Sequence, residues 1–140
     1  MIFLRSFNVV IVEDLIEHQN ILQSVIKAMK KPKINPILKS DGLSAHSYIQ
    51  SAYDIHLFII DIKLPGLSGD ELLRDIRTTE RYMDTPIIIL TSSSSAADKK
   101  RCEDFNVNNY IVKPINLNVD TLKPLQECIL KYYNVWYKYG

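Results

Sequence analysis

The sequence predicts an α/β protein in which a parallel β-sheet is covered by helices on both faces. Short runs of Val, Ile and Leu alternate along the chain with longer segments whose apolar residues recur at helical spacing. Continuous apolar runs are typical of strands that are buried on both faces. Right-handed crossovers between such strands produce a doubly wound, five-stranded parallel sheet. Clear strands are predicted at residues 8–12, 57–60 and 86–90, with a shorter one at 109–112 and a weaker one at 35–39.

Helical periodicity fills the intervals between the strands. The apolar stripes comprise Leu15, Leu22, Val25, Ile26 and Met29; Ala45, Tyr48, Ile49 and Ala52; Leu72, Leu73 and Ile76; and Leu122, Leu125, Ile129 and Tyr133. The fourth helical segment, residues 95–105, is mostly polar and offers the core only Ala97, Cys102 and Phe105. We therefore expect the fourth helix to be held loosely and to be able to move.

Composition indicates a folded globular chain of 140 residues, with 46% apolar and 24% charged residues. The net charge of +1 gives no global signal for binding nucleic acid or a membrane. Cys102 and Cys128 are too few for a disulfide framework and are interpreted as reduced thiols of a cytosolic protein. The N-terminal segment lacks the pattern of a signal peptide, and no apolar run approaches the roughly 18 residues of a membrane span.

Polar side chains follow four of the five predicted strands. Glu13 and Asp14 follow the first strand, Asp61 the third, Thr91 the fourth and Lys113 the fifth. Each residue alone has an ordinary explanation, such as a helix cap, a polar turn or a surface lysine. Ligands of open parallel sheets bind beyond the carboxyl ends of the strands, where all of these residues meet. Their joint occurrence therefore predicts a functional site.

The chemistry that suits these residues is phosphoryl transfer to a carboxylate. Three clustered acids repel one another, and oxygen ligands favour Mg²⁺ as the neutralising ion. Asp61 is the candidate nucleophile, which would form an acyl phosphate. Lys113 supplies a point charge for a phosphoryl oxygen, and the Thr91 hydroxyl can donate to another.

These motifs resemble the receiver domain of two-component response regulators. They are the acid pair at residues 13–14, "IIDIKLPGLSG" around Asp61, "ILTS" with Thr91 and "YIVKP" with Lys113. The intervals of 30 residues from Asp61 to Thr91 and 22 from Thr91 to Lys113 suit this family. The resemblance implies a flavodoxin-like topology with strand order 2-1-3-4-5. It also implies one domain over residues 1–140, with a core at about 7–133 and an aromatic tail at 134–140.

The resemblance further implies a phosphoacceptor protein rather than an enzyme, with at most self-catalysed phosphorylation and dephosphorylation. The phosphoryl group would come from a phosphohistidine on a sensor histidine kinase or a histidine phosphotransfer protein. Asp14 and Asp61 would ligate Mg²⁺ directly, Glu13 mostly through water, and Lys63 through its backbone carbonyl. A cis bond between Lys113 and Pro114 is also implied.

In this family the signal spreads from the phosphoryl group to a distant surface. The Thr91 hydroxyl would move toward the phosphoryl group, and Tyr110 would swing inward. The switch surface would be the fourth helix, fifth strand and fifth helix, which could also form a homodimer. The Lys63 side chain would either reach the site or lie in solvent, and Ser93 would leave the path of attacking water open.

Other functions are less consistent with the sequence. An aspartyl-phosphate phosphohydrolase dependent on Mg²⁺ would place an acid two residues after the nucleophile, where Lys63 stands. A flavin-binding protein would need a phosphate loop after the first strand, but "VEDLIEH" is acidic. A receiver used only for docking would lack a site residue, and none is missing.

Three histidines and the chain end complete the expectations. We interpret His18, His46 and His56 as structural or surface residues outside the strand-end cluster. The aromatic tail either completes the last helix and packs locally or forms a patch for a partner. No DNA-binding segment follows, so we expect no direct contact with nucleic acid. A receiver that acts alone and a fragment of a larger regulator both remain open.

Overall fold

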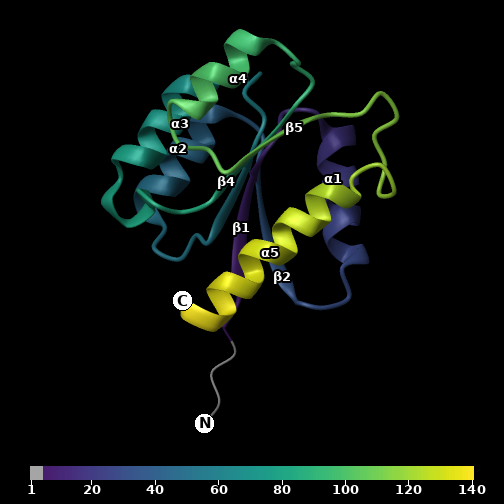
Figure 1. Ribbon diagram of the computed structural model, residues 1–140. Helices are drawn as coiled ribbons and strands as arrows, with labels where there is room; N and C mark the ends of the chain where they lie inside the picture. The colour runs from purple at the N-terminus through teal and green to yellow at the C-terminus, as the bar shows by residue number, and fades with distance from the viewer. Residues whose placement is uncertain (1–4) are drawn as a thin grey trace.

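The computed structural model describes residues 5–140, which form one five-stranded parallel sheet and five α-helices (Figure 1). The sheet order is β2-β1-β3-β4-β5, so the predicted fold class and strand order are confirmed. A short 3-10 helix at Glu80–Tyr82 precedes β4. The strands are β1 (Phe7–Val12), β2 (Ile34–Lys39), β3 (Leu57–Ile60), β4 (Ile87–Thr91) and β5 (Asn109–Val112). The helices are α1 (Ile16–Ala28), α2 (Gly42–Ser51), α3 (Gly69–Thr78), α4 (Ala96–Glu103) and α5 (Lys123–Tyr139).

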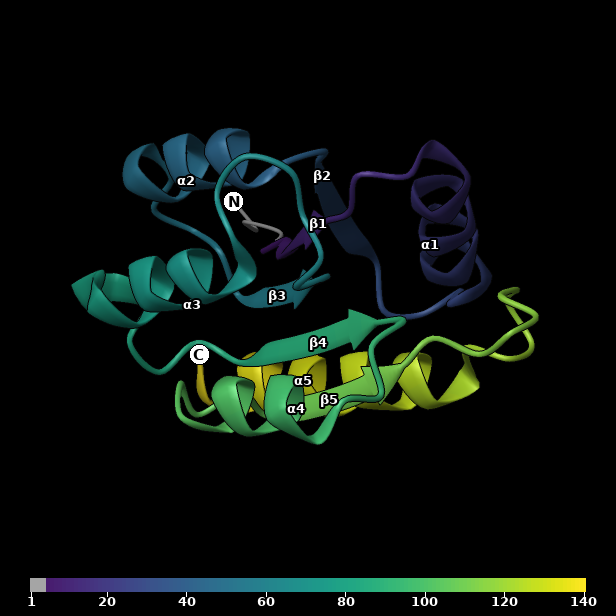
Figure 2. The same cartoon turned by 90° about the horizontal axis from the view of Figure 1, so that it is seen from above.

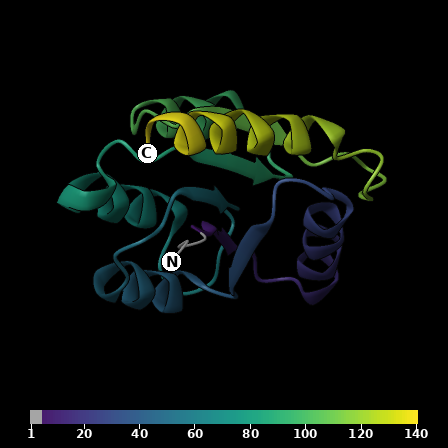
Figure 3. The ribbon, with the colours of Figure 1, turned by 90° about the horizontal axis from the view of Figure 1, so that it is seen from below.

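The helices form a layer on each face of the sheet. Helices α1 and α5 share one apolar cluster, and α2, α3 and α4 share the other (Figure 2). On the first face, α1 lies toward β2 and α5 toward β4 and β5 (Figure 3). Strand β1 serves both clusters, because Val9 and Ile11 face α1 and α5 while Val10 and Val12 face the opposite layer. This burial on both faces explains the continuous apolar run in the sequence.

Two predicted core residues are instead exposed. Leu15 is 50% exposed because it is the N-cap residue of α1 and precedes the first helical turn. In α4, Ala97 faces solvent, whereas its neighbour Asp98 is buried together with Cys102. The polar sequence of α4 did not indicate which side of the helix faces the core, because a buried charge breaks the apolar pattern.

The aromatic residues at the end of the chain belong to α5, as the local-packing interpretation predicted. Trp136 packs on Phe7 and His56, with ring centroids 5.1 and 4.8 Å apart. Tyr133 meets Phe7 edge-on at 5.4 Å. Among the described helices, none has the length and hydropathy needed to cross a membrane.

The implied cis bond between Lys113 and Pro114 is absent. Within residues 5–140, the one cis peptide bond joins Lys31 and Pro32. Because an X–Pro bond prefers trans by only about 0.5–1 kcal/mol, the local sequence does not determine the isomer.

The loop after β3 is packed closely against the start of α3. Ser68 caps α3 by accepting a hydrogen bond from Glu71 N at 3.2 Å, and its hydroxyl donates to the Glu71 carboxylate. Gly69 follows at the first helical position and is buried. A Cβ atom there would lie 2.7 Å from Ile62 Cα. Ile62, the residue after Asp61, can therefore lie against the start of α3 because Gly69 has no side chain.

We expect Gly69→Ala to lower the free energy of unfolding by about 1–3 kcal/mol, because the added methyl group must displace the Ile62 backbone. Urea denaturation would measure the change. Ser47→Ala, at an exposed position of α2, is the control and should change stability by less than about 0.5 kcal/mol. Equal stabilities of the two variants would show that the loop around Ile62 can move to accommodate the methyl group without loss of stability.

Candidate functional site

Three carboxylates converge at one edge of the sheet. Glu13 and Asp14 follow β1, and Asp61 follows the adjacent strand β3, where Asp61 N donates to Val12 O at 3.0 Å. Each acid has an oxygen within 4.8 Å of the other two. Glu13 and Asp61 are buried and Asp14 is half-buried. The strand pairing thus brings together the acids that the sequence predicted as a cluster.

Lys113 extends from the end of β5 into this cluster. Its Nζ atom lies 2.6 Å from Glu13 Oε1 and 2.9 Å from Asp61 Oδ2, and its side chain is 6% exposed. Burial alone would lower the pKa of the ammonium, but hydrogen bonds to Asp61 and Glu13 outweigh burial and raise this pKa. The lysine therefore remains charged and partly neutralises the acids.

His18 also contacts this cluster, so the expectation that it lies outside was wrong. The Lys113 ammonium donates to His18 Nδ1 at 2.9 Å, and this nitrogen lies 3.7 Å from Glu13 Oε1. The sequence argument considered only strand ends, whereas His18 lies on α1. Its position four residues after Asp14 was the available signal, because α1 begins directly beyond the acids.

The other two histidines have the structural roles that the sequence predicted. His46 Nδ1 lies 2.7 Å from Asp75 Oδ2 and so links α2 to α3. His56 Nδ1 accepts a hydrogen bond from Asn8 N at 3.0 Å, and burial lowers the pKa of this imidazole. Neither side chain is part of the acidic cluster.

Thr91 and Tyr110 both contact the loop between β4 and α4. Thr91 is fully buried, and its Oγ1 accepts a hydrogen bond from Ser93 N at 3.3 Å. The Tyr110 hydroxyl donates to Ser93 O at 2.8 Å. Burial raises the pKa of this phenol, so it remains a donor at neutral pH. Tyr110 on β5 thus holds the same loop that covers the Thr91 hydroxyl.

A second charged cluster connects this loop to α4. It was not predicted from the sequence. Asp98 accepts hydrogen bonds from the Ser93 hydroxyl and from Arg101, and Lys63 Nζ lies 3.7 Å from Asp98 Oδ2. Arg101 also pairs with Asp70 of α3 at 3.3 Å. The spacing of Asp98 and Arg101 on one helix was a signal for their pairing.

The Lys63 side chain lies largely in solvent, which is one of the two expected paths. It is 61% exposed, yet its ammonium pairs with Asp98 on α4. Its backbone N–H donates to Asp61 Oδ1 at 2.9 Å. Both carboxylate oxygens of Asp61 are thus engaged, one by this amide and one by Lys113.

Comparison with known families agrees with this arrangement. Residues 9–122 match the family model described as the response regulator receiver domain. The chain belongs to this family. The match includes most of β1, the whole of the other four strands and the acidic cluster, so residues 9–122 form a receiver domain of the two-component type.

One relative is similar to this receiver over most of the receiver's length. It is 33% identical to the osmolarity two-component system protein SSK1 of Saccharomyces cerevisiae, covering 81% of this chain and 19% of that protein. This receiver therefore spans about a fifth of that relative.

Solved structures share the fold. The chemotaxis response regulator CheY4 of Vibrio cholerae superposes with a TM-score of 0.74 at 26% identity, covering 88% of this chain and 98% of the other. The receiver domain of the sensor histidine kinase PA1611 from Pseudomonas aeruginosa, which holds a magnesium ion in its active-site cleft, superposes with a TM-score of 0.75. Its identity is 23%, with 91% of this chain and 98% of the other covered.

We expect Lys113→Met to reduce the free energy of unfolding by about 3–5 kcal/mol, because Glu13 and Asp61 would be left as buried charges without the ammonium. Chemical denaturation at neutral pH and without added divalent metal would measure this loss. Lys99→Met, at an exposed position of α4, removes the same charge and should have little effect. A similar small effect for both variants would contradict a structural role for Lys113.

Asp98→Asn should loosen α4, because the amide loses the charge that pairs with Arg101 and Lys63. Amide hydrogen exchange over residues 96–103 should become faster than in Asp104→Asn, which breaks only the exposed pair with Lys100.

The effect of Asp98→Asn should also depend on pH. Hydrogen bonding by Ser93 lowers the pKa of Asp98 below 3.8 in the folded state, so its stabilisation is present above that pH. As the pH falls through the lowered value, the difference between wild type and Asp98→Asn should disappear. A difference that is constant down to pH values well below 3.8 would show that the charge is not responsible.

Proposed function

We propose that this receiver is a phosphoacceptor switch in which Asp61 takes a phosphoryl group from a phosphohistidine. The observation that supports this most directly is the convergence of Glu13, Asp14 and Asp61 within 4.8 Å, with Lys113 bound to two of them. An Asp61 oxygen would attack phosphorus as the nitrogen–phosphorus bond breaks. The electron pair of that bond would return to the histidine of the donor.

The residues present fit a magnesium ion. Asp14 and Asp61 would bind the ion directly through hard carboxylate oxygens and Glu13 mostly through water, and the Lys63 carbonyl would complete the protein ligands. Three acids are only partly neutralised by one lysine, so the cluster retains the negative charge that attracts a divalent cation. When bound, Mg²⁺ would neutralise the charge of the incoming phosphoryl group. The magnesium ion of the PA1611 receiver supports this assignment.

Lys113 and Thr91 would stabilise the phosphoryl group. The Lys113 ammonium already lies 2.9 Å from an Asp61 oxygen and can shift to a phosphoryl oxygen without losing Glu13. The Thr91 hydroxyl would donate to another oxygen, which draws the Ser93 loop inward. Tyr110 would follow because its hydroxyl is bonded to Ser93 O. The surface formed by α4, β5 and α5 would then change conformation and bind a partner protein or a second copy of the chain.

The phosphoryl donor would be a sensor histidine kinase or a histidine phosphotransfer protein. A phosphohydrolase is less consistent with the site, because the residue two positions after Asp61 is Lys63, whose side chain pairs with Asp98. That arrangement supplies no general acid or base for hydrolysis at this position. The protein would therefore act as a phosphoacceptor and not as a hydrolase.

We expect beryllofluoride, a mimic of the phosphoryl group, to bind only in the presence of Mg²⁺. Amide NMR should show shifts at Thr91, Tyr110 and α4, because the mimic completes the contacts proposed for the phosphoryl group. Asp61→Asn should abolish these shifts, whereas Asp84→Asn at an exposed loop position should retain them. Folded wild-type protein that gives no shifts would contradict the switch and support a receiver used only for docking.

A further inference from the structure

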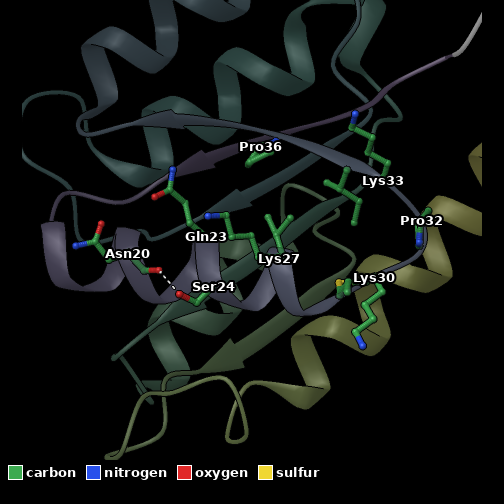
Figure 4. A pocket seen from close by; sticks show the side chains of 11 residues that line it. Asn20, Gln23, Ser24, Lys27, Lys30, Pro32, Lys33 and Pro36 are labelled. Atoms are coloured by element: carbon green, nitrogen blue, oxygen red, sulfur yellow. Dashed lines mark hydrogen bonds between the residues drawn. The ribbon is translucent and has the colours of Figure 1, made fainter.

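A groove lies between α1 and the edge strand β2, on a different part of the surface from the acidic cluster. Its volume is about 680 Å³, and its lining comes from α1, from the connection that follows it and from β2 (Figure 4). The side chains of Gln23 and Lys27 project from α1, while Lys33 and Pro36 lie on the opposite side. A cavity of this size is large enough to receive several side chains of a ligand.

The charge around this groove is strongly one-sided. Residues 18–40 contain five of the 17 basic residues and none of the 16 acidic ones, although the whole chain has a net charge of only +1. Three of these lysines, Lys27, Lys30 and Lys33, line the groove and are exposed. None of the three forms an ion pair within the described part of the chain.

The helix dipole accounts for only one of these lysines. Lys27 lies in the last turn of α1, where a positive charge is favourable. Lys30 and Lys33 follow the end of α1 at Ala28 and lie outside the helix. Their positive charge therefore remains available for a ligand.

Part of the groove lining, its floor, is apolar, beside the polar side chains of Asn20, Gln23 and Ser24. Ile26 and Ile34 are nearly buried, at 6% and 8% exposure, and belong to the core. Met29 is half-buried beside them, and Pro32 also contributes to the lining. Methionine adapts its side chain to irregular surfaces. An apolar floor with a lysine rim matches a ligand that combines aliphatic groups with carboxylates.

The backbone of β2 disfavours addition of another strand. β2 is an edge of the sheet, and Pro36 has no N–H group to donate to a neighbouring chain. Recognition at this edge therefore depends on side chains. The lining also has no aromatic residue or arginine on which a base could stack, which disfavours nucleic acid.

We propose that this groove binds an acidic segment of a partner protein, with aliphatic side chains on the floor and carboxylates at Lys27, Lys30 and Lys33. The complementary charge of the rim selects this occupant. The proposed site is independent of phosphorylation at Asp61.

The probe for this proposal is a ten-residue peptide made of two copies of Glu-Leu-Glu-Glu-Leu. It would be titrated into the ¹⁵N-labelled chain. Saturable amide shifts are expected over residues 26–34, and they should weaken as salt rises because exposed charges are screened. The same peptide with Lys in place of Glu should produce no such shifts.

Two triple variants separate local from total charge. Lys27→Gln/Lys30→Gln/Lys33→Gln should weaken binding roughly tenfold, since each exposed ion pair contributes modestly. Lys99→Gln/Lys131→Gln/Lys138→Gln removes the same charge from exposed sites outside the groove and should bind as wild type does. Absence of saturable shifts, equal weakening in both variants, or an equal response to inorganic phosphate alone would overturn the proposal.

Discussion

The contact of the Lys113 ammonium with the Glu13 and Asp61 carboxylates joins the ends of three strands at one edge of the sheet. Strands β1 and β3 are neighbours, but β5 lies beyond β4, so this lysine connects elements that the sheet itself separates. Buried carboxylates need a counter-charge, and Lys113 provides it with a side chain that is almost fully covered. The geometry of the acidic edge depends on this one cation.

The same edge is connected to α4 through hydrogen bonds, in addition to the apolar packing of Cys102. Tyr110 and Asp98 both hold the Ser93 loop, and Arg101 ties α4 to α3. Polar contacts of this kind can be replaced by new ones when a charge appears nearby. A packed apolar face, in contrast, leaves a cavity when it separates from its neighbour. The polar anchoring of α4 is thus consistent with an element that has two positions.

Charge is distributed unevenly along α1. The helix starts beside the acidic cluster, where His18 contacts Lys113, and it ends in the lysine-rich groove. The two regions carry opposite charges, and the lysines of the groove lie at the last turn of α1 and beyond it. A ligand at one end therefore need not compete with a ligand at the other.

Most of the fold and of the candidate site could be predicted from the sequence. Apolar runs and helical stripes predicted the sheet and its helices, because a strand buried on two faces requires a continuous run of apolar residues. The positions of Glu13, Asp14, Asp61, Thr91 and Lys113 at strand ends predicted the site, since parallel strands end at a common edge. Tertiary structure decided the contact of His18 with Lys113 and the contacts of Asp98 with Ser93 and Lys63. These side chains lie on helices and loops, where contacts depend on how distant elements pack and leave no periodic pattern along the chain.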